Sequence, residues 1–392
     1  AVRLILWRNL ASLYTNVFDD IDNAIMAYKV VRQMDSGSLE DAAILAGLYG
    51  RKAETRDKGV ALYHQLIERG ADFRGGVKAL RKLYHAERDF DAVYVCCATL
   101  HALKAVDEEE ARIFNYLSQG VPAWAKSGLL EAQWASILHP DLGNSIGHLA
   151  AELYRAAPDF VTTSAKKLGL KKRDYVDMGS DLFFVGIVRR VMDLLSIHGV
   201  DLCRKKGALE PLQLLNAQPP ALVLGEKNEI FRSADQTYIR FVVGRMLAYA
   251  RPELFLARIF GMKSFRALLC GLCGVYNRDL QVGQEDIEIQ EWTRRLDAMP
   301  DNVLRRLNTP ARDAYAELIE GNKLQKYLEA VELTAARAGF VASGSLAVAL
   351  NGVSQASDGI IDLAGDIRRQ DLLKFSMSQG YVALRKDSGA SI

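Results

Sequence analysis

A five-residue pattern recurs at a fixed interval along the first quarter of the chain. It reads Leu-x-x-Leu-Tyr at residues 10–14, 45–49 and 80–84, so each copy begins 35 residues after the one before. Leucine, leucine and tyrosine at positions i, i+3 and i+4 fall on one face of an α-helix. A single pair of helices cannot bury such a face, so neighbouring pairs must stack to cover it. The spacing therefore predicts a stack of helix pairs, with an irregular helical bundle as the alternative.

The second half of each unit repeats at the same offset. Residues 22–28 and 57–63 both carry Asp, a β-branched residue and Tyr at three-residue spacing, and residues 90–94 continue the pattern loosely. This array resembles the tetratricopeptide repeat, an antiparallel helix pair of about 34 residues. Trp7 stands three residues before Leu10, as in the first helix of that repeat. Later units lack this tryptophan, and the proline that closes each unit is missing. The resemblance implies a concave groove that holds a peptide or a partner domain.

The boundaries of the predicted repeat array are set by the residues at which the 35-residue pattern becomes weak. A weaker fourth unit is expected at residues 108–139, which assigns residues 1–140 to repeats and residues 141–199 to a connecting helical region. The first residues enter a helix without a capping residue. This favours a chain cut from a longer repeat array, and removal of a methionine before Ala1 is the alternative.

Composition bounds the possible partners. Hydrophobic residues make up 49% and charged residues 25% of the 392 residues, as in soluble globular proteins. The net charge of +2 provides no bulk attraction to nucleic acid or to a membrane, and no apolar run is expected to have the length of a membrane span. Residues 166–173 form a compact basic patch without interleaved aromatics, which favours a solvated face over a nucleic-acid surface.

The five cysteines are odd in number and follow no disulfide framework. They indicate a reducing compartment, so a cytoplasmic location is expected. Cys270 and Cys273 form a CxxC motif but lack a second pair, which favours buried apolar residues over a zinc or redox site.

The last part of the chain, residues 200–392, has a different character. Residues 212–215 and 221–224 are short apolar runs on either side of a turn with two prolines, which predicts two strands of a small sheet. Helices are expected before and after these strands in the sequence, so the expected fold class is mainly α, with a helical solenoid followed by an α+β domain that has a small sheet. Residues 366–387 are expected to pack back on this domain, and residues 388–392 to form a frayed tail.

One predicted helix, at residues 241–253, has the frame of a known catalytic motif without its chemistry. Zinc peptidases carry His-Glu-x-x-His on a helix, where both histidines bind the metal and the glutamate activates water. Here Arg245 and Tyr249 take the two histidine positions and Met246 takes that of the glutamate. Arginine has no lone pair to give a metal, and methionine cannot accept a proton from water. The alternative for this string alone is a core helix with one polar edge.

A second stretch strengthens this interpretation. Residues 332–339 read Glu-Leu-Thr-Ala-Ala-Arg-Ala-Gly, which resembles the later helix of gluzincin metallopeptidases of the heat-shock protease HtpX and prenyl-protein protease type. The family pattern is Glu-x-x-x-Asp followed by Arg-x-Gly, in which the glutamate is the third zinc ligand and the aspartate supports the site. Glu332 matches the ligand, Ala336 replaces the aspartate, and Arg337 and Gly339 fit the flank. The resemblance covers roughly residues 200–385 and implies a zincin-like domain. For Glu332 alone, an exposed helix glutamate is the alternative.

A physical consequence follows from this resemblance. A carboxylate at Glu332 that points inward without zinc would be an unpaired buried charge, which is unfavourable. Arg245 replaces a ligand of the same metal, so we expect an ion pair between Arg245 and Glu332, with Tyr249 nearby. We therefore expect a vacated metal site with no catalytic residues, no metal and no cofactor. The expected function is that of a non-catalytic scaffold that binds a partner protein or peptide, and the alternative is an active hydrolase with a non-standard site.

Overall fold

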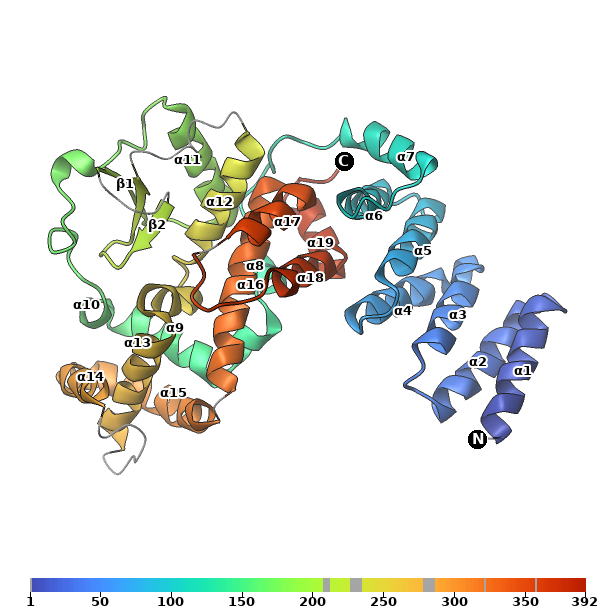
Figure 1. Ribbon diagram of the computed structural model, residues 1–392, viewed down its shortest axis with the longest axis horizontal. Helices are drawn as coiled ribbons and strands as arrows, with labels where there is room; N and C mark the ends of the chain where they lie inside the picture. Colours follow the sequence, from blue (N-terminus) through green and yellow to red (C-terminus); the bar gives the residue numbers. More distant parts are fainter. Residues whose placement is uncertain (1, 207–211, 226–234, 278–285, 321, 357) are drawn as a thin grey trace. The chain divides into compact units, whose positions relative to one another are not determined.

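The protein is described by a computed structural model that covers residues 2–206, 212–225, 235–277, 286–320, 322–356 and 358–392. The chain forms two compact units, drawn in Figure 1. The first comprises residues 1–125 and 373–392, and the second comprises residues 126–372. Nineteen helices and one small sheet appear in the described part of the chain. The prediction of a mainly α protein with a small sheet is confirmed.

The first unit consists of helix pairs in which α1 packs on α2, α3 on α4 and α5 on α6. Each pair also contacts the next, through α2 with α3 and α4 with α5. Side-chain caps fix several helix starts, since Asp20, Ser38, Asp72 and Asp89 each accept a hydrogen bond from a backbone N–H of the first turn. The helices of this unit are α1 (Val2–Asn16), α2 (Ile21–Met34), α3 (Leu39–Gly50), α4 (Arg56–Glu68), α5 (Phe73–Ala86), α6 (Phe90–Ala102), α7 (Glu108–Ser118) and α19 (Gln379–Asp387).

The repeated Leu-x-x-Leu-Tyr pattern falls on α1, α3 and α5. In α3 all three pattern residues are buried, and in α5 Leu80 and Tyr84 are buried. The 35-residue spacing therefore corresponds to a real repetition of helix pairs. The pattern residues of α3 and most of those of α5 are buried, whereas Leu13 on α1 is 46% exposed.

The expected fourth repeat does not form. After α7 the chain leaves the first unit, and the next helix, α8 (Glu131–Ile137), belongs to the second unit. Trp134 anchors α8 there: its ring is buried and its indole N–H donates to the carbonyl of Leu195 at 2.8 Å. The backbone N–H of Leu129 also donates to the carbonyl of Leu194. Helix α8 therefore packs within the second unit and does not continue the repeat.

The C-terminal segment also departs from expectation, because residues 373–392 belong to the first unit. Arg385 on α19 makes two hydrogen bonds to the carboxylate of Asp91 on α6, at 2.8 and 3.1 Å, and both side chains are buried. The tail is not frayed: the guanidinium of Arg385 donates to the carbonyl of Ala390, and the N–H of Ile392 donates to Asp91. This buried charge pair, between residues 294 positions apart, holds the C-terminal segment in place.

The second unit contains the sheet, in the order β1-β3-β2. The predicted strands are β2 (Leu212–Leu215) and β3 (Ala221–Gly225), which pair antiparallel. A third strand, β1 (Asp201–Lys205), pairs parallel with the other edge of β3. The sequence did not indicate β1, because only two of its five residues are apolar and charged residues lie at both ends of the strand.

Of the remaining helices, α12 packs on β2, and most of the others pack on one another. They are α9 (Ser145–Ala156), α10 (Pro158–Val161), α11 (Phe183–Leu195), α12 (Gln236–Ala248), α13 (Pro252–Tyr276), α14 (Ile287–Asp297), α15 (Asp301–Ile319), α16 (Lys323–Ser343) and α17 (Leu346–Gln355), and α18 (Gly365–Ser376) leads back to the first unit.

Helix α13 has the length and composition of a membrane span, contrary to the sequence-based expectation. It is interrupted at Gly261, whose φ of 66° breaks the helical backbone. Helices α9, α14, α15 and α16 pack against it. These contacts are compatible with a soluble protein.

Helices α12 and α16 of the second unit pack on each other and run antiparallel. Arg240 donates to the carbonyl of Ala342 at 2.7 Å, while Arg245, further along α12, contacts Glu332 near the middle of α16. Gly244 permits this approach, since a Cβ there would lie 2.5 Å from the Cβ of Ala342. A Cβ at Gly339 would lie 2.7 Å from the carbonyl of Phe241. Small residues thus set the distance at which charged groups of the two helices meet.

Candidate functional site

Arg245 lies in the last turn of α12, and its side chain is buried between two carboxylates. One guanidinium nitrogen lies 3.2 Å from a carboxylate oxygen of Glu332 on α16. A second nitrogen donates to a carboxylate oxygen of Asp358 at 2.7 Å. Glu332 is 1% exposed, so its charge depends on these partners. The predicted ion pair between Arg245 and Glu332 is confirmed.

The stretch after α17 supplies the other half of the site. The N–H of Ile360 donates to the second oxygen of Glu332 at 2.6 Å. Arg258 on α13 donates to the carbonyl of Asp358, and its guanidinium lies 3.6 Å from the carboxylate of that residue. Two arginines and two carboxylates therefore alternate, which lets each buried charge face one of opposite sign.

The electrostatics of this cluster favour the charged forms of Arg245 and Asp358. Burial by itself would lower the pKa of Arg245, but Tyr249, Asp358 and Glu332 outweigh this effect and raise it above its usual range. Burial opposes ionisation of Asp358 as well, yet Arg245 and Arg258 hold the pKa of that carboxyl below its ordinary value of 3.8. The guanidinium thus remains a permanent cation at the centre of the site.

Tyr249 lies beside both arginines. Its ring centroid is 5.9 Å from the guanidinium carbon of Arg245 and 4.9 Å from that of Arg258, distances at which a cation is attracted to the ring face. The side chain is fully buried, and no group in the described part of the chain hydrogen-bonds its hydroxyl. Burial raises the pKa of Tyr249, so it stays neutral. Tyr249 lies near the ion pair, as expected.

The two other predicted positions contribute only packing. Met246 and Ala336 are buried on α12 and α16, and among the described contacts none joins their side chains to the charged cluster. Asp358 and Arg258 were not predicted. The only signal for them in the sequence is an Asp-Gly pair in a loop and one arginine on an apolar helix, and neither is specific.

Arg337, which fitted the flank of the metallopeptidase pattern, makes a separate pair. Its guanidinium donates to both carboxylate oxygens of Asp371 on α18, at 2.5 and 2.9 Å. It also donates to the carbonyl of Leu138 after α8. His139 lies 3.8 Å from the same carboxylate, too far for a hydrogen bond. These contacts link α16 to α18 and to the end of α8, and both carboxylate oxygens of Asp371 accept hydrogen bonds from Arg337.

The chemistry that this arrangement permits is narrow. Arginine offers only donors, and both oxygens of Glu332 already accept hydrogen bonds. Within the described ranges no three histidine, cysteine, aspartate or glutamate side chains gather to hold a metal ion. The cluster can hold helices together around a fixed cation.

Other predicted features lie away from this cluster. The lysines and the arginine of the basic patch at residues 166–173 are exposed, as expected of a solvated face. Cys270 and Cys273 are buried free thiols, also as expected.

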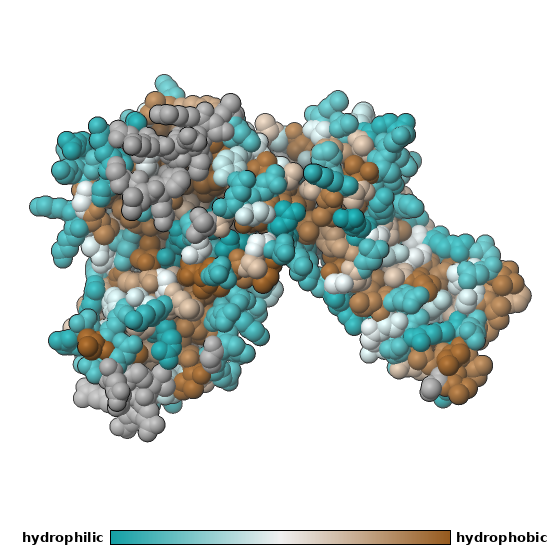
Figure 2. Space-filling view, viewed as in Figure 1, coloured by the Kyte–Doolittle hydropathy of each residue, from teal (hydrophilic) through white to brown (hydrophobic). Residues whose placement is uncertain are grey.

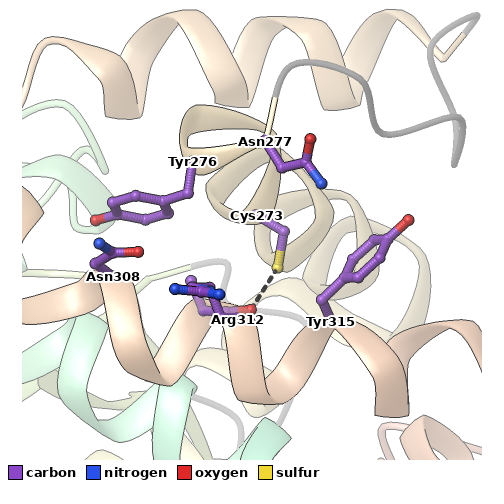
Figure 3. A pocket seen from close by; sticks show the side chains of 7 residues that line it. Cys273, Tyr276, Asn277, Asn308, Arg312 and Tyr315 are labelled. Atoms are coloured by element: carbon purple, nitrogen blue, oxygen red, sulfur yellow. Dashed lines mark hydrogen bonds between the residues drawn. The ribbon is translucent and has the colours of Figure 1, made fainter.

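A pocket of about 460 Å³ opens between α13 and α15 (Figure 3). The hydroxyl of Tyr276 donates to the carbonyl of Leu304, and the thiol of Cys273 donates to that of Ala311. Two of the polar groups in this pocket thus serve to pack α13 on α15. The lining residues are Cys273, Tyr276, Asn277, Asn308, Ala311, Arg312 and Tyr315, none of which was predicted as a site residue.

Comparison of the chain with protein families, with curated proteins and with solved structures gave no match.

Proposed function

We propose that this chain is a non-catalytic, cytoplasmic interaction protein, with a tetratricopeptide-like helical solenoid followed by a zincin-like domain that has lost its metal. The observation that supports this most directly is the guanidinium of Arg245, which lies between the carboxylates of Glu332 and Asp358. It supplies the positive charge that a zinc ion would supply to Glu332.

This exchange explains why a buried carboxylate persists on α16. When a metal ligand is lost, the remaining ligands become unpaired charges in a poorly solvated site. An arginine on the facing helix removes that penalty permanently, because it does not lose its proton at physiological pH. The same substitution abolishes hydrolysis, since no lone pair remains to hold zinc and Met246 offers no base.

The helix pairs of the first unit provide the binding function. Stacked pairs create an extended surface made from one helix of each pair, and proteins built this way bind peptides or partner domains along it. A protein or peptide is therefore the proposed partner, and nucleic acid and membrane are not.

The proposal can be tested by rebuilding the motif. We expect the purified chain to contain no stoichiometric zinc, and the triple variant Arg245→His, Met246→Glu, Tyr249→His to bind one equivalent by metal analysis. Adding Glu332→Ala to the triple variant should abolish that binding, because the third ligand would be lost. Adding Glu329→Ala, a change at a half-buried glutamate on the same helix, should leave it intact.

Each possible outcome bears on the proposal. If the triple variant keeps its helical circular-dichroism spectrum but takes up no zinc, the zincin-like interpretation is wrong. Stoichiometric zinc in the unaltered chain, dependent on Glu332, would instead support the alternative of an active hydrolase.

A further inference from the structure

The pocket between α13 and α15 has the size of a site for a small molecule. Its volume of about 460 Å³ lies within the range of roughly 300–1,000 Å³ that is typical of ligand sites. Its polar and aromatic lining residues are Cys273, Tyr276 and Asn277 on α13, and Asn308, Arg312 and Tyr315 on α15. Spacings of three and four residues place each set on one face of its helix, so the two faces meet at the pocket.

Two of the lining groups are fixed and uncharged. The thiol of Cys273 donates to the carbonyl of Ala311 at 3.4 Å, and the hydroxyl of Tyr276 donates to the carbonyl of Leu304 at 2.6 Å. Burial raises the pKa of each group to about 12, so both stay neutral. They hold the two helices together and place no negative charge beside a ligand.

Arg312 is the one charged side chain among the described lining residues. It follows Asn308 by one helical turn, and Figure 3 shows the two side chains next to each other on α15. In the described part of the chain, no hydrogen bond or ion pair engages either side chain. A guanidinium can donate two parallel hydrogen bonds to a carboxylate, and an amide can supply a third donor. These two side chains therefore offer a set of donors to an anion.

The charge balance at this pocket favours an anion of one unit. Helix α13 ends at Tyr276, so its last carbonyl groups, which carry the negative end of the helix dipole, lie beside the pocket. A phosphate monoester carries about −1.5 to −2 charges at neutral pH, more than one arginine balances. A carboxylate carries a single charge and matches the guanidinium in shape.

Aromatic rings form two sides of the pocket. Figure 3 shows the rings of Tyr276 and Tyr315 on opposite sides of Cys273. Both tyrosines are half-buried and both line the pocket. Aromatic rings pack favourably on other rings in offset or edge-on arrangements. A ligand with a flat ring would therefore contact both walls.

The surrounding surface favours a free solute over a protein. Most exposed side chains of α15 are polar, and Figure 2 shows a mainly hydrophilic surface with scattered hydrophobic residues over α14 and α15, at the lower left of the view. Protein partners commonly cover contiguous apolar patches, and on the face shown no such patch surrounds these helices.

We propose that this pocket binds a small aromatic carboxylate, with its carboxylate on Arg312 and Asn308 and its ring between Tyr276 and Tyr315. The ligand adds to the interaction function proposed above and does not depend on it. The pocket lies within the second unit and shares no residue with the charged cluster around Arg245.

Titration calorimetry of the full chain with 1-naphthoate tests the proposal. The unaltered chain should bind one equivalent with a Kd of roughly 1 mM or tighter. Arg312→Gln should weaken binding by roughly tenfold or more, because the charge-assisted hydrogen bonds to the carboxylate are lost. Arg305→Gln is the matched control: Arg305 is also exposed on α15 but does not line the pocket, so this variant should bind like the unaltered chain.

A second ligand and a second variant test the two halves of the site. 1-Naphthamide has the same rings without the charge, so it should bind the unaltered chain by roughly tenfold more weakly than 1-naphthoate. Asn308→Trp keeps Arg312 but should abolish binding, because its indole would fill the pocket from an exposed position. Both altered positions are exposed, so each variant should keep the thermal transition of the unaltered chain.

The opposite results overturn the proposal. If the unaltered chain shows no saturable binding of 1-naphthoate, the pocket is not a site for aromatic acids. Equal weakening by Arg312→Gln and Arg305→Gln would mean that the acid binds to positive surface charge in general. Undiminished binding to Asn308→Trp would place the ligand outside this pocket.

Discussion

Replacing Arg245 with methionine tests the reasoning about the charged cluster most directly. The substitution keeps an unbranched apolar stem but removes the cation, which leaves Glu332 with the Ile360 N–H and Asp358 with Arg258. Removing one partner of a buried ion pair destabilises proteins by about 3–5 kcal/mol. In a unit of this size, which runs from residue 126 to residue 372, each kcal/mol lowers the melting temperature by about 2–4 °C. We expect the transition of the second unit to fall by roughly 6–20 °C.

Scanning calorimetry of the full chain measures this effect, and Arg306→Met is the matched control. Arg306 pairs with Glu152 at 2.8 Å, but its side chain is 53% exposed, and exposed pairs contribute only about 0–1 kcal/mol. The double variant Arg245→Met, Glu332→Gln should regain much of the lost stability, because the uncompensated charge is removed. If Arg245→Met is no more destabilising than Arg306→Met, the buried cluster does not stabilise this unit and the reasoning fails.

Two further effects follow from the structure. Burial lowers the pKa of His64 below its ordinary value of 6.5, so the unfolded chain binds the proton more readily than the folded chain. The free energy of unfolding should therefore be highest above about pH 6.5 and fall as the pH drops below that value. Urea titrations of His64→Gln should show a weaker fall than those of the unaltered chain. Gly244→Ala should destabilise the second unit and disturb the packing of α12 on α16, since its Cβ would lie 2.5 Å from that of Ala342. Gly186→Ala on α11 is the control: its Cβ meets no atom within 4 Å, so it should raise stability by about 0.5–1 kcal/mol. Equal shifts of the melting temperature, with the same sign in the two variants, would contradict this prediction.

The sequence predicted what local periodicity encodes. A stripe at i, i+3 and i+4, repeated every 35 residues, gave the helix pairs of the first unit, because helix formation and the facing of side chains depend on neighbours in the chain. Two apolar runs on either side of a proline turn gave β2 and β3 for the same reason. The link between Arg245 and Glu332 also came from the sequence, through the argument that a buried carboxylate needs a cation.

Contacts between distant segments were beyond such reasoning. Strand β1 forms because its backbone pairs with the second edge of β3. Helix α8 does not continue the repeat because the ring of Trp134 is buried in the second unit. The C-terminal segment returns to the first unit through Arg385 and Asp91, which lie almost 300 positions apart in the sequence. No local pattern distinguishes such residues from solvated ones.

The sequence by itself thus determined the helix pairs, two strands and the need for a cation beside Glu332. Only the tertiary structure decided that Asp358 and Arg258 complete the cluster and that the chain's last residues stabilise its first unit. The physical reason is that periodic burial is set by adjacent residues, whereas the partner of a buried charge is set by whichever segment the folded chain brings within hydrogen-bonding distance.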